Sequence, residues 1–325
     1  MIIVRTPLRI SLAGGGSDFR GFYERTEGCV LSASIDKCVY TCIKRRFDDK
    51  IRVGYSITEF ADDIDELKHE LFREAMRMTG VRKGVEMATM ADIPTRGSGL
   101  GSSSTVTVGS LHALYSYRSE LVSADRLARE ACEIEINVLG KPIGKQDQYI
   151  AAFGGLKFIS FLADETVTVE PVNVTPETRR VLSENLLLFY TGVTRKAEDV
   201  LVEQKSKIGD TYEHIQAIRD QTYALRDYLE RGEVNAVGRT LYEAWERKKR
   251  LASGITSPEI DALYERALNA GAIGGKITGA GGGGFMLLYC RAADQPGVRR
   301  ALADLQELPF DIDDCGSRVV YNGQR

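Results

Sequence analysis

The chain has 325 residues, of which 43% are hydrophobic and 27% charged, a composition typical of a globular protein long enough for two domains. Its formal net charge of −3 excludes the strongly basic surface typical of nucleic-acid binding. We find no signal peptide, no apolar run of about 20 residues, and no cysteine and histidine pattern typical of a metal or redox site. The sequence therefore predicts a cytoplasmic protein, a monomer or homodimer, with no nucleic-acid or membrane partner.

The first half of the sequence alternates strand-like runs with helices. Short runs rich in β-branched residues predict strands at 2–4, 9–13, 29–34, 37–46 and 51–55. An acidic stretch opens a predicted helix over 62–78, and the strand expected at 84–93 leads into a loop rich in glycine and serine. A helix is expected over 123–138, followed by a pair of strands at 157–162 and 167–172.

The second half is expected to begin near Pro176, which gives domains at residues 1–174 and 175–325. An apolar run predicts a strand over 185–190. Charged stretches with helical spacing predict helices at 195–207, 212–231, 233–252, 258–270 and 295–306. The remaining expected elements are a glycine-rich turn and two strands, at 274–284, 285–290 and 319–321. This order favours an α+β class, with helices packed on a small antiparallel sheet.

Residues 94–104 read Pro-Thr-Arg-Gly-Ser-Gly-Leu-Gly-Ser-Ser-Ser and precede a stretch with helical spacing. The alternating glycines, Gly97, Gly99 and Gly101, allow a tight turn that brings several N–H groups toward one point. The serines fall at the expected helix start, where unpaired N–H groups and the helix dipole favour anions. No lysine follows the glycines, which distinguishes the loop from a P-loop. The pattern indicates a phosphate site, and a turn that only caps a helix is the alternative.

Two other segments carry polar side chains on turns. Residues 7–18 join a strand to a glycine turn that ends at Asp18, whose carboxylate can accept hydrogen bonds from two sugar hydroxyls or can cap a helix. A second turn follows a helix that ends at Gly140, and it carries Lys145 and Asp147. These two residues form either a surface ion pair or a base that a nearby cation keeps ionised.

A last glycine-rich segment, residues 276–285, contains four consecutive glycines. Since a hairpin turn needs fewer, we expect close approach of the backbone to a ligand there. These segments resemble the GHMP small-molecule kinases, a family that includes galactokinase, homoserine kinase, mevalonate kinase and phosphomevalonate kinase. The Gly-Leu-Gly-Ser-Ser run after Pro94 and the Lys-x-Thr-Gly-Ala-Gly-Gly-Gly-Gly run from Lys276 carry the resemblance, which spans the chain.

The resemblance implies a two-domain α+β fold with a ribosomal-S5-domain-2-like N-terminal domain, a ferredoxin-like C-terminal domain and the site between them. It implies ATP and Mg²⁺ as cofactors. Asp147 falls at the position of the catalytic base, and Arg9 at that of the basic residue beside it. The turn at Gly279–Gly283 would close over the site from the second domain.

The resemblance also implies which residues bind ATP, metal and substrate. Backbone N–H groups would hold the ATP phosphates, namely those of Gly97, Ser98, Gly99, Leu100, Gly101, Ser102, Ser103 and Ser104. Ser103 and Glu135 would be the Mg²⁺ ligands, with Ser102 or Ser104 as the alternative hydroxyl. The expected substrate contacts are Gly16, Ser17, Asp18, Asp36, Lys37, Gly281 and Gly282.

Within the family, residues 5–19, 34–37 and 144–149 look like those of the D-glycero-D-manno-heptose 7-phosphate kinase branch. Galactokinases usually carry Gly-Glu-His-x-Asp where this chain has Gly-Gly-Gly-Ser-Asp at 14–18. The resemblance implies phosphorylation of the anomeric hydroxyl of a sugar phosphate in the biosynthesis of nucleotide-activated heptose.

Two alternatives remain open: a kinase for another sugar, and a ligand-sensing regulator without turnover. A regulator would be expected to lose the base or the metal ligands, and Asp147, Ser103 and Glu135 are all present. Basic side chains are candidates to hold a substrate phosphate, with a solvated surface role as the alternative for each; they are Lys37, Lys44, Arg45, Arg46 and Arg195.

Overall fold

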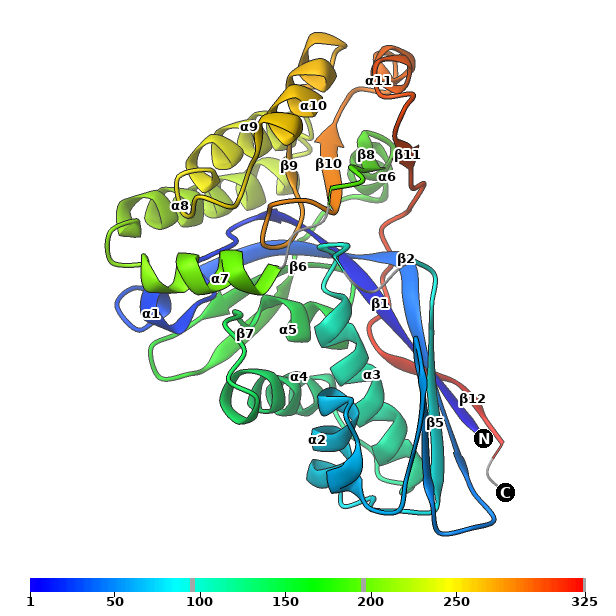
Figure 1. Ribbon diagram of the computed structural model, residues 1–325. Coiled ribbons are helices and arrows are strands. Elements are labelled where there is room, and N and C mark those ends of the chain that lie inside the picture. Colours follow the sequence, from blue (N-terminus) through cyan, green and yellow to red (C-terminus); the bar gives the residue numbers. More distant parts are fainter. Residues whose placement is uncertain (94–96, 194–196, 324–325) are drawn as a thin grey trace.

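The computed structural model describes residues 1–93, 97–193 and 197–323, which form two sheets with helices around them (Figure 1). The expected α+β class is confirmed. Residues 94–96, which open the glycine and serine loop, and Arg195, a candidate for a substrate phosphate, lie outside the described residues.

Within the described ranges the larger sheet has eight strands, in the order β12-β1-β2-β5-β3-β4, with β6 joined to β2 and β7 to β6. The strands are β1 (Ile2–Ala13), β2 (Gly28–Arg45), β3 (Ile51–Gly54), β4 (Thr58–Ala61), β5 (Val85–Ala91), β6 (Leu156–Phe161), β7 (Val167–Pro171) and β12 (Arg318–Asn322). β1 and β2 are each one long strand where the sequence predicted two, because their antiparallel pairing continues through two local register shifts.

Helices from the first half cover one face of this sheet (Figure 1). They are α2 (Glu70–Thr79), α3 (Ser102–Tyr117), α4 (Ala124–Cys132) and α5 (Gln146–Phe153), and the short helix α1 (Arg20–Tyr23) follows β1. Phe72 of α2 and Val108 and Leu111 of α3 pack with Ile2 and Val53 of the sheet, and all five are fully buried. Burying these apolar side chains stabilises the stack of helices on the sheet.

The second sheet is small and antiparallel, as expected, in the order β11-β8-β10-β9. Its strands are β8 (Leu186–Tyr190), β9 (Gly274–Ile277), β10 (Phe285–Tyr289) and β11 (Gln306–Glu307). The helices of the second half are α6 (Pro176–Glu184), α7 (Ala197–Ser206), α8 (Tyr212–Glu230), α9 (Ala236–Lys248), α10 (Pro258–Asn269) and α11 (Gln295–Ala301).

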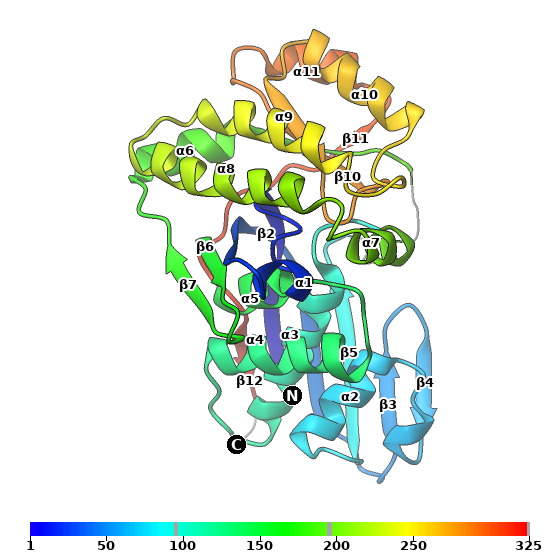
Figure 2. The same ribbon diagram turned by 90° about the vertical axis from the view of Figure 1, so that its left-hand side faces the viewer.

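Helices α8 and α9 join the two halves of the molecule, and Figure 2 shows them crossing above the larger sheet. Leu225 of α8 and Leu241 of α9 belong to one apolar core with Ile10 and Leu31 of the larger sheet and Leu287 of β10. The end of β1 is therefore held between helices of both halves, which is where the cavity described below is found.

Three expected helices differ from the structure. The helix expected over 62–78 begins at Glu70, because the acidic stretch before it forms a 3₁₀ turn (Ile64–Glu66) capped by the Asp63 side chain. The helix expected over 123–138 changes at Cys132 into a π-helix (Glu133–Val138), and the one expected over 295–306 ends at Ala301.

The strand β12 lies apart from the rest of the second half. It pairs with β1, placing Asn322 opposite Ile2, so residues 318–322 belong to the larger sheet. The expected second domain, 175–325, contains this strand, and the boundary near residue 174 stays a prediction. No helix in the part of the chain that the structure describes is long and apolar enough to cross a membrane.

Candidate active site

A cavity of about 360 Å³ lies where the two halves of the chain meet. From the first half it is lined by the end of β1, the glycine turn after it, the start of α3 and the loop before α5. From the second half it is lined by α7, α8, α9, β9 and the turn after β9. Parts of the segments 5–19, 97–104, 144–149 and 276–285 therefore meet in one place, whereas residues 34–37 do not line the cavity.

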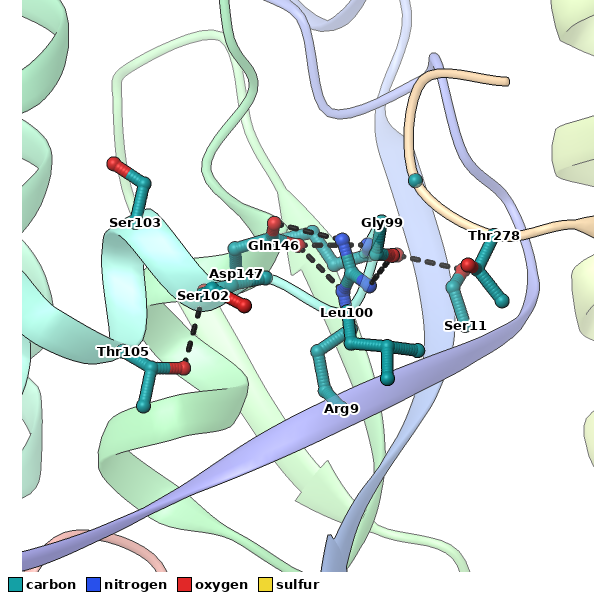
Figure 3. A network of polar contacts seen from close by, with 12 residues as sticks. Arg9, Ser11, Gly99, Leu100, Ser102, Ser103, Thr105, Gln146, Asp147 and Thr278 are labelled. Carbon is teal, nitrogen blue, oxygen red and sulfur yellow. Dashed lines mark hydrogen bonds and ion pairs between the residues drawn. The ribbon is translucent and has the colours of Figure 1, made fainter. Parts of the chain in front are cut away.

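Arg9 and Asp147 form a bidentate ion pair in the cavity wall (Figure 3). Nε and Nη2 of Arg9 donate to the two oxygens of Asp147, each over 2.7 Å. Two parallel bonds of this kind fix the orientation of the carboxylate and pair its charge. Lys145, the other candidate partner of Asp147, forms an ion pair with Glu165 instead.

Arg9 also holds the glycine and serine loop in place. Its Nη1 donates to the carbonyl oxygen of Gly99 over 2.6 Å, and its backbone N–H donates to that of Leu100 over 3.1 Å. The Arg9 side chain is only 5% exposed. One buried cation thus connects the strand β1, the loop before α3 and the Asp147 carboxylate in the first turn of α5.

The loop itself needs its glycines. Gly97, Gly99 and Gly101 have φ angles of +72°, +72° and +78°, in the left-handed region that favours glycine. Gly101 caps α3 without a side-chain hydrogen bond. The N–H groups at the start of α3 are therefore available to a ligand, and Ser102, Ser103 and Ser104 line the cavity there.

The glycines after β9 pack against this loop. A Cβ on Gly279 would lie 2.8 Å from the Gly99 Cα, and a Cβ on Gly284 would lie 2.5 Å from the Gly97 carbonyl oxygen. Thr278 adds a hydrogen bond, since its Oγ1 donates to the Ser98 carbonyl over 3.2 Å. At these two positions the close approach expected from the sequence is to another backbone.

Asp18 lies against the start of α5 in the cavity wall. Its two oxygens accept the backbone N–H groups of Gly16 over 3.0 Å and Gln146 over 3.2 Å. Burial, and then the nearby charge of Asp147, raise the pKa of Asp18. Gly144 leaves room for this carboxylate, because a Cβ there would lie 2.0 Å from Asp18 Oδ2.

Gln146 connects the two carboxylates. Its backbone N–H donates to Asp18, while its side-chain amide donates to Asp147 Oδ1 over 3.1 Å. Its amide oxygen accepts the hydroxyl of Ser11 over 2.9 Å. The network therefore sets the distance and orientation of Asp18 relative to Asp147, and Ser11 and Gln146 were not among the expected site residues.

Ser103 and Glu135 meet although 32 residues separate them. Ser103 Oγ donates to Glu135 Oε1 over 2.7 Å, and Gln148 Nε2 donates to Oε2 over 2.8 Å. Glu135 is fully buried in the π-helix, and this burial raises its pKa. In Figure 3 the Ser103 hydroxyl points away from the Arg9–Asp147 pair, so the two oxygen-rich places are distinct.

Other expected substrate contacts are not brought to the cavity wall. Ser17 is fully buried and bonds the backbone of Cys29. Lys37 pairs with Asp36, whose other oxygen accepts the N–H of Asp311. Gly281 and Gly282 face the loop at Ile255, whose carbonyl accepts the Gly282 N–H over 2.7 Å. Of the predicted substrate contacts, only Gly16 and Asp18 line the cavity.

Two lysines that the sequence interpretation did not assign also line the cavity, Lys248 of α9 and Lys276 of β9. Lys276 is the first residue of the last glycine-rich segment, and this position could have identified it as a candidate site residue. No sequence signal identifies Lys248, since it lies in a charged helix whose sequence is typical of a solvent-exposed surface.

We expect Gly144→Ala to destabilise the protein, because its Cβ would displace the buried Asp18 carboxylate. Overpacking of this kind lowers the free energy of unfolding by about 1–3 kcal/mol. Gly15→Ala is the matched control, since nothing lies within 4 Å of its Cβ and the effect should stay within about 0.5 kcal/mol. Urea unfolding of both variants measures the difference, and equal midpoints would contradict the expectation.

The chain is similar to known proteins in both sequence and structure. The GHMP kinases N terminal domain matches residues 66–155, and the GHMP kinases C terminal domain matches residues 225–307. A D-glycero-alpha-D-manno-heptose 7-phosphate kinase from Campylobacter jejuni is 31% identical over 315 residues, 93% of each chain. A galactokinase from Thermococcus kodakarensis is 27% identical over 352 residues, 94% of each chain.

The crystal structure of a D-glycero-D-manno-heptose 1-phosphate kinase from Bacteroides thetaiotaomicron has a TM-score of 0.83 at 26% identity and covers 100% of both chains. A mevalonate kinase structure, at 19% identity and a TM-score of 0.74, shares the fold. The expected two-domain fold and the resemblance are both confirmed. The chain belongs to the GHMP kinase family and is an ATP-dependent kinase.

Proposed function

We propose that this kinase phosphorylates the anomeric hydroxyl of D-glycero-D-manno-heptose 7-phosphate, giving the 1,7-bisphosphate in the biosynthesis of nucleotide-activated heptose. The observation that carries the proposal is the Arg9–Asp147 pair, which lies in one cavity with Asp18 and the start of α3. The name of the Campylobacter jejuni relative supports the choice of a heptose 7-phosphate.

In this proposal Asp147 is the general base. Its carboxylate takes the proton of the anomeric hydroxyl as that oxygen attacks the terminal phosphorus of ATP. A new phosphorus–oxygen bond forms while the bond to the ADP oxygen breaks, and the proton remains on Asp147 until water removes it. An anomeric hydroxyl is more acidic than an ordinary alcohol, so a carboxylate is a sufficient base.

Arg9 has two parts in the proposed reaction. Its bidentate contact fixes the orientation of the Asp147 carboxylate, which a base needs before the hydroxyl arrives. Its fixed positive charge also lies beside the place where negative charge develops on the transferring phosphoryl group. The N–H groups of residues 97–104 would hold the other phosphates of ATP, as a helix start does.

Asp18 would orient the sugar. Each of its oxygens accepts one backbone N–H and keeps further acceptor capacity for a sugar hydroxyl. Because Gln146 bonds both Asp18 and Asp147, a sugar held by Asp18 would present its next hydroxyl to the base in a fixed position. This positioning is the main contribution that the first half offers to the acceptor.

The oxygens of Ser103 and Glu135 fit a magnesium ion. A hydroxyl and a carboxylate that meet over 2.7 Å are hard donors, and Mg²⁺ is usually held by one or two protein carboxylates together with waters and substrate phosphates. No group of three or more acidic, histidine or cysteine side chains gathers into a metal site in the described ranges. When bound with ATP, the ion would offset the negative charge of the phosphates.

We expect Asp147→Asn to lower kcat by at least about 100-fold, the scale for loss of a general base. ATP affinity, measured by calorimetry, should be retained, because the start of α3 is unchanged. Asp49→Asn makes the same chemical change at an exposed side chain and should leave kcat unaltered. A near wild-type turnover of Asp147→Asn would show that another group takes the proton.

Ser103→Ala and Glu135→Gln should each weaken activity in a way that excess Mg²⁺ partly restores. Ser102→Ala and Ser104→Ala are the comparisons, since the Ser102 hydroxyl bonds Ser98. Activity against Mg²⁺ concentration for the four variants decides which hydroxyl is the ligand. Identical profiles for the three alanine variants would remove Ser103 from the metal site.

The substrate is tested by comparing acceptors under one set of conditions: heptose 7-phosphate, heptose 1-phosphate, free heptose, mannose 6-phosphate and galactose. A phosphate held by one or two basic side chains should raise kcat/KM about 30- to 1000-fold over the unphosphorylated sugar. Phosphorus NMR of the product locates the new phosphate. Equal use of galactose or free heptose, or preferred use of heptose 1-phosphate, would overturn the assignment.

A further inference from the structure

The second half contributes two ammonium groups to the cavity, and neither has a charged partner. Lys276 is 6% exposed, and Lys248 is partly buried. Among the described residues, neither lysine forms an ion pair and the Lys276 ammonium makes no hydrogen bond. Lys248 Nζ donates only to the carbonyl oxygen of Gly279, which is not charged.

The other charged groups of the cavity are already engaged. Arg9 is bound to Asp147 through both carboxylate oxygens, and Asp18 accepts two backbone N–H groups. Burial, and then the positive charges of Lys248 and Arg9, hold the pKa of Lys276 well below its usual value. An anion bound in this part of the cavity would favour the charged forms of both lysines.

The pKa of Lys248 is also lowered. Burial and the charge of Arg9 lower it to about 8, and the opposing effect of Asp18 and Asp147 is smaller. The position of Lys248 has a structural explanation, because its ammonium donates a hydrogen bond to the Gly279 carbonyl and so holds that turn in place. This explanation does not extend to Lys276, whose buried amine makes no ion pair and no hydrogen bond among the described residues.

We propose that Lys248 and Lys276 form a subsite that binds a phosphate group in the cavity. It belongs to the second half of the chain and is separate from the N–H groups at the start of α3. An anion between the two ammonium groups would compensate their charge and make charge-assisted hydrogen bonds in a partly desolvated place. The inference rests on the proposed function only for the identity of the bound phosphate. This phosphate is either the one that the sugar substrate already carries or the terminal phosphate of ATP.

The first test measures binding without any sugar. Inorganic phosphate is titrated into the full chain and into Lys248→Met and Lys276→Met, which remove the charge and keep a long side chain. We expect each variant to lose about 10-fold or more in phosphate affinity. The matched control is Lys249→Met, because Lys249 is the next residue, pairs with Glu246 and does not line the cavity.

Thermal unfolding of the same variants separates ligand binding from a structural role. Lys276→Met should unfold at the same or a higher temperature, because it replaces a buried polar amine that has no partner among the described residues with an apolar side chain. A folded Lys276→Met protein with wild-type phosphate affinity would overturn the proposal, and so would a loss of affinity equal to that of Lys249→Met. A marked loss of stability in Lys276→Met would assign the lysine to the fold and also count against it.

Steady-state kinetics then identify which phosphate is bound. A rise of about 10-fold or more in KM for the sugar phosphate, with KM for ATP unchanged, assigns the subsite to the acceptor. The reverse pattern assigns it to the terminal phosphate of ATP. Unchanged values of both KM and kcat would contradict a role for the pair in the kinase reaction. If heptose 7-phosphate is not the substrate, the titration with inorganic phosphate still decides whether the subsite exists.

Discussion

The contact between two glycine turns is the constraint on which the cavity depends. At residues 97–101 and 279–284 backbone meets backbone, and a Cβ on Gly99 would lie 2.6 Å from the Thr278 carbonyl oxygen. Because side chains are excluded, the wall formed by the second half closes directly onto the helix start and Arg9. The halves of the molecule are otherwise joined by the apolar core around α8 and α9.

The buried charged side chains around the cavity differ in the kind of partner that each one has. The Arg9–Asp147 pair is complete, Asp18 is satisfied by backbone N–H groups, and Glu135 is held by a hydroxyl and an amide. Burial raises the pKa of both Asp18 and Glu135. Arg9, Asp18 and Asp147 bring charged groups of both signs to the cavity wall.

The sequence predicted the elements well where the signal is local. The glycine and serine loop, the strands β8 and β10 and the long helices of the second half follow from spacing and turn chemistry. The turn expected to carry Asp147 differs, because the helix α5 begins at Gln146 and Asp147 lies in its first turn. The π-helix that holds Glu135 was not predictable, because one pattern of apolar residues serves both α and π geometry. Lys248 was not predictable either, since its burial depends on how α9 crosses the larger sheet. The placement of Asp36 and Lys37 away from the cavity depends on the tertiary contact between Asp36 and Asp311.

The pairing of β12 with β1 has a consequence for how the chain folds as it is synthesised. The outer edge of β1 at Ile2–Arg5 receives its partner only when residues 318–322 have emerged from the ribosome. Until then a nascent chain carries an open strand edge beside an apolar core, the feature that promotes pairing with other chains. The large sequence separation of this contact makes it slow to form. We therefore expect a chain truncated before residue 318 to aggregate more readily than the full chain, independently of the chemistry in the cavity.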